Sequence, residues 1–481
     1  MIQKRSNEIS SHSSVVRRCV SITLVLVYIV FLFSCYKTII SPAFSYAGVF
    51  YHDLPPAYLF ASVFLSLFPV LILPTRIVRP SDYASWFLYL AVVVPASFVP
   101  ALVLPNREED FGVVTTLVSA YLIFELVRGR KLLKLPYCQM DDTVFRCILP
   151  IVLVIIATAI FAHANFSIDL SFDDTLYDRR LAAREVVGEW SVLAYFENFA
   201  VAVGMPFLIA LLLIQRDWLS VPVLVYLAVA VFSFDGEKTA IFAPLLFLGV
   251  GWMSLPQSKR TPLSSPPAPP AAYHLLGGFV LLLSFSLLEP VLFGTSKLAI
   301  ILVRRLLIMP AQLSSYYFDF WTDNPLVWMG DGWLGRLGIT HNPYSYGAPM
   351  VIGAQYFGNP QTNANANLWA AAFAQFGYLG VFVTSITAAF FLRLLDSVTA
   401  VGRGRLRYLT GCILAASIGS IWADSAFHTS LLTNGVLPGA ILLAMLPTEA
   451  SRDRESSSPA RKKPYAPQSQ AATVSHVFCN E

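Results

Sequence analysis

The sequence predicts an all-α polytopic integral membrane protein with about twelve transmembrane helices. Of its 481 residues, 56% are hydrophobic and 13% are charged, whereas a soluble domain carries about 25% charged residues. Its apolar runs approach the ~20 residues with which a helix crosses a bilayer. One interval, residues 294–369, is instead polar and aromatic, which predicts a large loop outside the membrane.

Apolar length places the expected spans, and charge orients them. The spans are expected at residues 19–36, 57–74, 84–105, 112–128, 147–164, 191–214, 218–233, 239–255, 274–293, 370–392, 409–426 and 431–447. Lys and Arg gather in every second connection, as in the RGRKLLK run of residues 128–134. Because such loops stay in the cytoplasm, we expect both termini there.

Five regions follow from this topology. They are a cytoplasmic N-terminus (1–18), nine transmembrane helices (19–293), a large periplasmic loop with short helices (294–369), three further helices (370–447) and a disordered cytoplasmic tail (448–481). The six cysteines lie outside the expected periplasmic segments, so no disulfide framework is expected. The spacing of Cys and His suggests no zinc site.

Arginines expected outside the membrane depart from the usual charge bias and need a reason. Arg179, Arg180 and Arg184 lie in the helix-like segment DRRLAAREVV. A guanidinium group binds two phosphate oxygens at once through parallel hydrogen bonds, and it stays charged at any working pH. These arginines therefore suggest a site for a phosphorylated ligand; the alternative is a solvated face paired with nearby carboxylates.

A second pair of arginines, Arg304 and Arg305, interrupts the apolar run 298–309. That run is too short to cross a bilayer, so we expect it at the membrane interface, with Pro310 ending the helix. Two adjacent arginines there could clamp a lipid-linked diphosphate. The alternative is that both side chains reach out to lipid headgroups.

The turn SFDGEKT places three charged residues between two apolar helices. Asp235 and Glu237 are candidate catalytic bases, and Lys238 is a candidate cation for the diphosphate. Gly236 provides the permissive backbone. The simpler interpretation is an exposed hairpin tip.

The large loop supplies aromatic, acidic and imidazole groups. Tyr316 and Tyr317 suit stacking against sugar rings, and Asp319 follows them as a candidate base. His341 is the only histidine of this loop and is a further candidate base. The alternatives are an interfacial aromatic belt and an ordinary exposed histidine.

An asparagine ladder precedes the next span. Asn363, Asn365 and Asn367 alternate before Trp369, and amide side chains together with an indole suit sugar hydroxyls and rings. If this stretch is helical, Asn363 and Asn367 share one face. The alternative is that the asparagines cap the helix.

One acidic residue lies near the outer end of a late span. Asp424 stands four residues before His428, so on a continuous helix the two would share a face. Placing an ionisable group at that depth in the membrane costs free energy, so such a residue is a candidate functional residue. We therefore count Asp424 among the candidate sugar-binding residues.

Several of these motifs together resemble the O-antigen (oligosaccharide repeat-unit) polymerases, the Wzy-type family. The motifs are LYDRRLAARE, SFDGEKTAIFAP, RRLLIMPAQLSSYYFDF, NANANLWAAAFAQFGYLGV and HTSLLTNGVL. The resemblance implies a GT-C-like glycosyltransferase that polymerises undecaprenyl-diphosphate-linked repeat units at the periplasmic face. The wider superfamily has His-Asn where this chain has Ala364-Asn365 or Ala366-Asn367, so no histidine role is carried over there.

The expected chemistry needs cations for the leaving diphosphate and a base for the acceptor hydroxyl. No DxD-like pair stands out, so we expect no metal and no cofactor, with inversion implied by the resemblance. Expected partners are the lipid-linked donor and acceptor, membrane lipid and a chain-length regulator, but no nucleic acid. The alternatives are an O-antigen ligase-like transferase and a polysaccharide flippase or transporter.

Overall fold

The computed structural model describes residues 2–104, 111–133, 140–171, 179, 182–183, 192–255, 270–400 and 404–446. The expected disordered tail and the Pro-rich segment 261–269 lie outside these ranges. All regular secondary-structure elements of the described residues are helices. These residues also contain one isolated β-bridge, between Arg76 and Ala271, but no strand. The all-α prediction is confirmed for this part of the chain.

Six helical segments of the described residues are long and apolar enough to cross a membrane. They are Ser14–Ala47 (α1, Ile2–Cys35, with η1, α2 and η2), Val144–His163 (in α7, Asp142–His163), Val192–Gln215 (α9, η7 and α10), Ala272–Phe293 (α13), Leu368–Ala400 (α17) and Arg405–Asp424 (α18). Four shorter apolar segments are Pro56–Leu71 (α3 and η3), Ser220–Asp235 (α11), Thr239–Ser254 (α12) and Val436–Met445 (α20). The chain is therefore a multi-pass membrane protein.

The two remaining expected spans coincide with helices that are not among these long or shorter apolar segments. Residues 84–105 fall on a broken series of short helices, and residues 112–128 fall on α6. The series comprises α4 (Ser81–Leu88), η4 (Tyr89–Val93), η5 (Pro95–Ser97) and α5 (Val99–Val103), and α6 spans Gly112–Arg128. The residues of α4, η4 and α5 are buried throughout, so these elements lie inside the protein.

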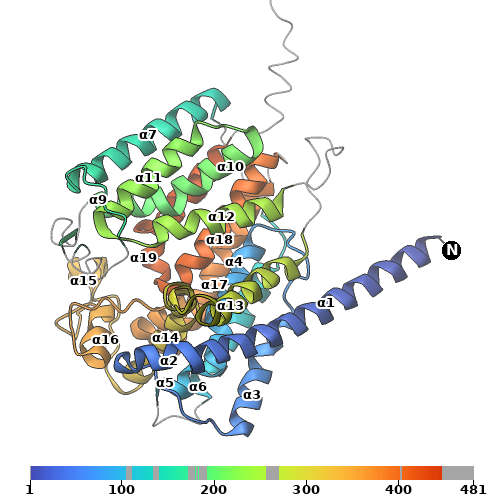
Figure 1. Ribbon diagram of the computed structural model, residues 1–481, viewed down its shortest axis with the longest axis vertical. Helices are drawn as coiled ribbons and strands as arrows, with labels where there is room; N and C mark the ends of the chain where they lie inside the picture. The colour runs from blue at the N-terminus through green and yellow to red at the C-terminus, as the bar shows by residue number, and fades with distance from the viewer. Residues whose placement is uncertain are drawn as a thin grey trace, which may run out of the picture.

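The central helices are α17 and α18. In Figure 1, α7, α10, α11 and α12 form one group, α1 crosses the molecule beside α13, and α17 and α18 lie between. Along α18 nearly every residue is buried, and its Gly, Ala and Ser residues let α4, α10 and α12 approach closely. This central position fixes Asp424, the last residue of α18, relative to its neighbours.

A kink divides α17 near one end. Gly377 has φ +60° and ψ −150°, a backbone conformation that is essentially restricted to glycine. The kink frees the carbonyl groups of Ala374 and Gln375, which accept hydrogen bonds from the backbone N–H groups of Val327 (2.9 Å) and Trp328 (3.1 Å). The loop that follows α14 is thereby anchored to the transmembrane helix.

The large loop is more deeply packed than the sequence analysis expected. The π-helix η8 (Ala299–Ile308) continues into α14 (Met309–Asp323), and Pro310 lies in the first turn of α14, where proline is tolerated. The expectation that Pro310 ends the helix was wrong. Residues 310–318 are buried, because α14 packs against α5, α17 and η8. Two short helices follow, α15 (Trp333–Arg336) and α16 (Ala348–Phe357).

A buried ionic network joins α4, α6 and α17 at the end of the bundle opposite Asp424. Arg128 binds Glu125 through two hydrogen bonds (2.6 and 3.0 Å) and Asp82 through a third (2.6 Å). Ser81 donates to Asp396 through both its backbone N–H (2.9 Å) and its hydroxyl (2.6 Å). All four charged side chains are buried, so removal of one partner would leave a buried charge uncompensated.

Candidate functional site

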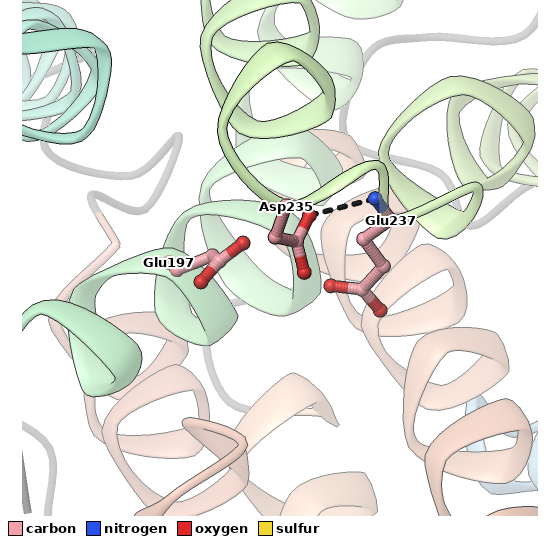
Figure 2. A group of neighbouring side chains, drawn as sticks. All are labelled: Glu197, Asp235 and Glu237. Atoms are coloured by element: carbon pink, nitrogen blue, oxygen red, sulfur yellow. Dashed lines mark hydrogen bonds between the residues drawn. The ribbon is translucent and has the colours of Figure 1, made fainter. Parts of the chain in front are cut away.

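Three carboxylates gather where α9 (Val192–Phe199) meets the turn between α11 and α12. Oxygens of Glu197, Asp235 and Glu237 lie within 4.8 Å of one another, and in Figure 2 Asp235 stands between the two glutamates. Gly236, with φ +68°, makes the turn. The carboxylate of Asp235 accepts a hydrogen bond from the backbone N–H of Glu237 at 2.6 Å. Asp235 thereby stabilises the turn, and the turn fixes the backbone position of Glu237.

Such a cluster has two chemical uses. A carboxylate oxygen can accept the proton of a hydroxyl group placed against it. Carboxylate oxygens are also the ligands that Mg²⁺ and Ca²⁺ prefer, so these three residues could hold a divalent cation. Glu197 was missed in the sequence analysis. The available signal was its position as an acidic residue inside an otherwise apolar span.

The cluster lies beside Asp424 and Arg305. The charges of Arg305 and Glu237 both act on Asp424, which places these three side chains in one neighbourhood. Asp424 and Arg305 are exposed, and Glu237 is partly exposed. The end of α18, the α11–α12 turn and η8 therefore bring two carboxylates and a guanidinium together at one accessible end of the bundle.

The two adjacent arginines of η8 have different surroundings. Arg304 is partly buried, and its guanidinium carbon lies 3.9 Å from the centre of the Phe44 ring. Burial, followed by the charge of Arg305, lowers the pKa of Arg304. Arg305 is exposed to solvent. Of the pair predicted to clamp a diphosphate, Arg305 faces the candidate site and Arg304 packs against the protein.

Arg179 is engaged by its own segment. Its guanidinium lies 3.3 Å from the Asp169 carboxylate and donates to the carbonyl groups of Asp169 (2.9 Å) and Ser171 (3.0 Å). It also lies 5.5 Å from the centre of the Phe232 ring. The structure thus gives Arg179 a role in fixing this segment. Arg180 and Arg184 lie outside the described residues.

Lys238 lies beside the carboxylate cluster, whereas His341 lies in an exposed part of the large loop. Lys238 is partly exposed at the start of α12, next to Glu237, and so remains close to the carboxylate cluster. His341 is exposed in the loop between α15 and α16. Its backbone packs against Gly330, where an added Cβ would lie 2.6 Å from the His341 carbonyl carbon.

His428 and Asp331 form a second polar neighbourhood. The helix breaks at Ser425, and His428 lies in a separate helix, α19 (Phe427–Leu432); the expected continuous helix with Asp424 was wrong. Surrounding protein lowers the pKa of His428, and the charge of Asp331 opposes this shift. Asp331 accepts hydrogen bonds from Gln375 (3.2 Å) and from the backbone of Ala348 (3.0 Å). Asp331 was not predicted from the sequence, where only its Gly-Asp-Gly turn could have indicated it.

The structure does not support a sugar-binding role for the paired tyrosines. Tyr316 is buried and stacks on Tyr356, with ring centres 4.2 Å apart, and Tyr317 is buried and donates to the Ala364 carbonyl group at 3.1 Å. The Asp319 carboxylate accepts the Tyr356 hydroxyl at 2.5 Å. These side chains hold α14 against α16 and against the segment before α17, and a soluble sugar cannot reach the two rings.

The asparagine ladder is extended rather than helical. Asn363 and Asn365 are exposed, whereas Asn367 is buried, so the helical arrangement in which Asn363 and Asn367 would share one face does not occur. Asn367 caps α17, because its side-chain oxygen accepts the backbone N–H groups of Trp369 (3.0 Å) and Ala370 (3.1 Å). Trp369 is buried and donates to Ser385 at 2.8 Å. Only the first two asparagines remain accessible to a saccharide.

Asn367→Ala should destabilise the protein without a specific loss of ligand binding. The variant removes the helix cap, which costs about 1 kcal/mol, and also the hydrogen bond from the Asn367 amide to Ser314. Unfolding temperature in detergent measures this effect. Asn363→Ala, at an exposed position of the same ladder, is the matched control and should leave the unfolding temperature unchanged. Equal unfolding temperatures for the two variants would contradict the capping role.

No protein-family model, curated protein or solved structure matches the chain. The function is therefore inferred from the residues that the fold brings together.

Proposed function

We propose that this chain is a membrane glycosyltransferase that polymerises lipid-diphosphate-linked saccharide units at one face of the membrane. The observation that carries the proposal is the group of Glu197, Asp235 and Glu237, whose oxygens lie within 4.8 Å of one another, with the charge of Arg305 and the carboxyl group of Asp424 in the same neighbourhood. These residues come from distant parts of the chain, and together they offer a cation and carboxylates at the ends of membrane helices.

The two kinds of group match the two requirements of glycosyl transfer. A guanidinium stabilises the negative charge that develops on a leaving diphosphate. A carboxylate accepts the proton of the attacking sugar hydroxyl. Exposed Asn363 and Asn365 can donate and accept hydrogen bonds with sugar hydroxyls.

In the proposed step, the acceptor hydroxyl oxygen forms a bond to the anomeric carbon of the donor sugar. The bond between that carbon and the diphosphate oxygen breaks, and the diphosphate leaves with the electron pair, held by Arg305. Glu237 takes the hydroxyl proton. The products are the lengthened lipid-linked saccharide and a lipid diphosphate, and the step needs no oxidant or reductant.

The proposal includes the topology and the substrate. With both termini in the cytoplasm, the end of the bundle that carries Asp424 faces the periplasm of a bacterial inner membrane. Undecaprenyl-diphosphate-linked repeat units of O-antigen or exopolysaccharide are the substrate class. A GT-C-like arrangement with twelve spans belongs to the same proposal.

Arg305→Ala should reduce elongation of lipid-linked repeat units about 100- to 1,000-fold, as expected for loss of a group that stabilises transition-state charge. The measurement uses purified full-length protein in proteoliposomes without an ion gradient, supplied with undecaprenyl-diphosphate-linked repeat units extracted from the host. Chain length is determined by gel electrophoresis.

Arg304→Ala is the matched control, because the adjacent side chain packs on Phe44. This variant should lose thermal stability and retain elongation in proportion to the folded fraction. The polymerase proposal fails if the wild-type protein gives no elongation. Transfer only to the lipid A core would assign the ligase reaction instead, and gradient-dependent movement of unextended units would assign transport.

A further inference from the structure

A basic surface lies at the end of the bundle opposite the candidate site. Four cations form it: Arg79 before α4, Arg130 and Lys131 after α6, and Arg393 in α17. We call these residues the basic surface. Because α17 crosses the bundle from Leu368 to Ala400, Arg393 lies at the far end of this helix from the loop that contains Asp331.

The basic surface is held in a fixed shape. Arg79 donates to the carbonyl groups of Arg128 and Arg130, both at 3.1 Å. Arg393 donates twice to the Lys131 carbonyl group, at 3.2 and 2.6 Å. These bonds tie the segment after α6 to α17 and to the residues before α4. The guanidinium groups of Arg79 and Arg393 are therefore held beside the backbone that carries Arg130 and Lys131 before any ligand arrives.

The charge of the basic surface is not neutralised locally. Within the part of the chain that the structure describes, none of its four cations forms an ion pair with a carboxylate. The neighbouring carboxylates are buried: Asp82 and Glu125 bind Arg128, and Asp396 accepts from Ser81. Arg130 and Lys131 are exposed to solvent.

Apolar side chains on the same helices are exposed next to these cations. Leu126, one turn before Arg130, is 66% exposed, and Phe390, one turn before Arg393, is 45% exposed. The guanidinium of Arg393 lies 5.9 Å from the centre of the Phe390 ring. A soluble anion would need only the cations. A ligand with an anionic headgroup and acyl chains matches both parts of the surface.

We propose that the basic surface is a binding site for an anionic phospholipid. The phosphate lies against Arg79, Arg130, Lys131 and Arg393, and the acyl chains lie along α6 and α17 over Leu126 and Phe390. The site is separate from the proposed glycosyltransferase site, and its existence does not depend on that activity. In the proposed topology it lies at the cytoplasmic leaflet.

The test is lipid binding by the purified full-length protein, measured by native mass spectrometry during titration with phosphatidylglycerol or phosphatidylcholine. The wild-type protein should bind phosphatidylglycerol more tightly. The double variant R130Q/K131Q should weaken that binding about 30-fold, from ~1 kcal/mol for each cation near a membrane surface. Its unfolding temperature should not change, because these two exposed side chains do not hold the segment in place.

The matched control is R461Q/K462Q, which removes the same charge from the C-terminal tail and should retain wild-type affinity. Equal affinity of the wild-type protein for the two lipids would overturn the site. An equal loss in both double variants would also overturn it, because the effect would then follow total charge rather than this surface.

Discussion

Replacing Glu237 by Gln should lower the rate of elongation about 100- to 10,000-fold, the range expected for loss of a general base. Glutamine keeps the size of the side chain but cannot take the hydroxyl proton. The α11–α12 turn should persist, since it depends on Asp235 and on the φ of Gly236. Elongation by purified protein, with repeat units attached to undecaprenyl diphosphate, gives the rate.

Asp235→Asn is the comparison variant for Glu237. The amide oxygen of asparagine can still accept the Glu237 backbone N–H, so the turn is kept and the loss of rate should be smaller. Asp424→Asn tests the other exposed carboxylate of the site. Full activity of Glu237→Gln together with loss in Asp424→Asn would move the base from Glu237 to Asp424, while the reaction class would stand.

Arg128→Met should destabilise the protein by about 3–5 kcal/mol, the usual cost of breaking a buried ion pair. The variant leaves Asp82 and Glu125 without their cation. Both side chains are only about 5% exposed, so water cannot solvate their charges. The free energy of unfolding can be measured by denaturant titration in mixed micelles. Expression and insertion should fall with it, whereas the chemistry at the opposite end of the bundle is not directly changed.

Arg130→Gln is the control for Arg128, because it lies two residues later and is exposed. Its effect on the free energy of unfolding should stay within about 0.5 kcal/mol. The triple variant R128M/D82N/E125Q should recover part of the stability, since the two carboxylates that Arg128 binds are then replaced by neutral amides. Similar free energies of unfolding for Arg128→Met and the wild-type protein would show that the network contributes little.

The helices were predictable because apolar length and charge bias are local properties of the sequence. The turn at Asp235–Lys238 was also found, since it interrupts two apolar runs. The proximity of Glu197 to this turn was not found, because it depends on how the fold brings α9 beside residues that lie about 40 positions later in the chain. The exposed position of Arg305 and the partly buried position of Arg304 likewise follow from packing against Phe44 and not from composition.

Two errors had an identifiable physical cause. The Asn-Ala alternation from Asn363 to Asn367 has a period of two, which is typical of an extended chain, and the structure is extended there with Ala364 and Ala366 buried. A helical interpretation ignored that period. The paired tyrosines were expected to contact sugars because they lie beside Asp319 in a polar segment expected outside the membrane. The polar groups of this segment are instead satisfied inside the protein, as when Ser314 and Ser315 donate to carbonyl groups one turn earlier.

The π-helix η8 has a consequence for how this segment can change in evolution. Its ten residues place Arg304 over Phe44 and leave Arg305 exposed. Deletion of one residue between Ala299 and Val303 would bring Arg305 into the place of Arg304 and expose Leu306 instead. The apolar composition would hardly change, yet the cation facing the carboxylates would be lost. Homologues should therefore vary more freely in the identity of these apolar residues than in their number.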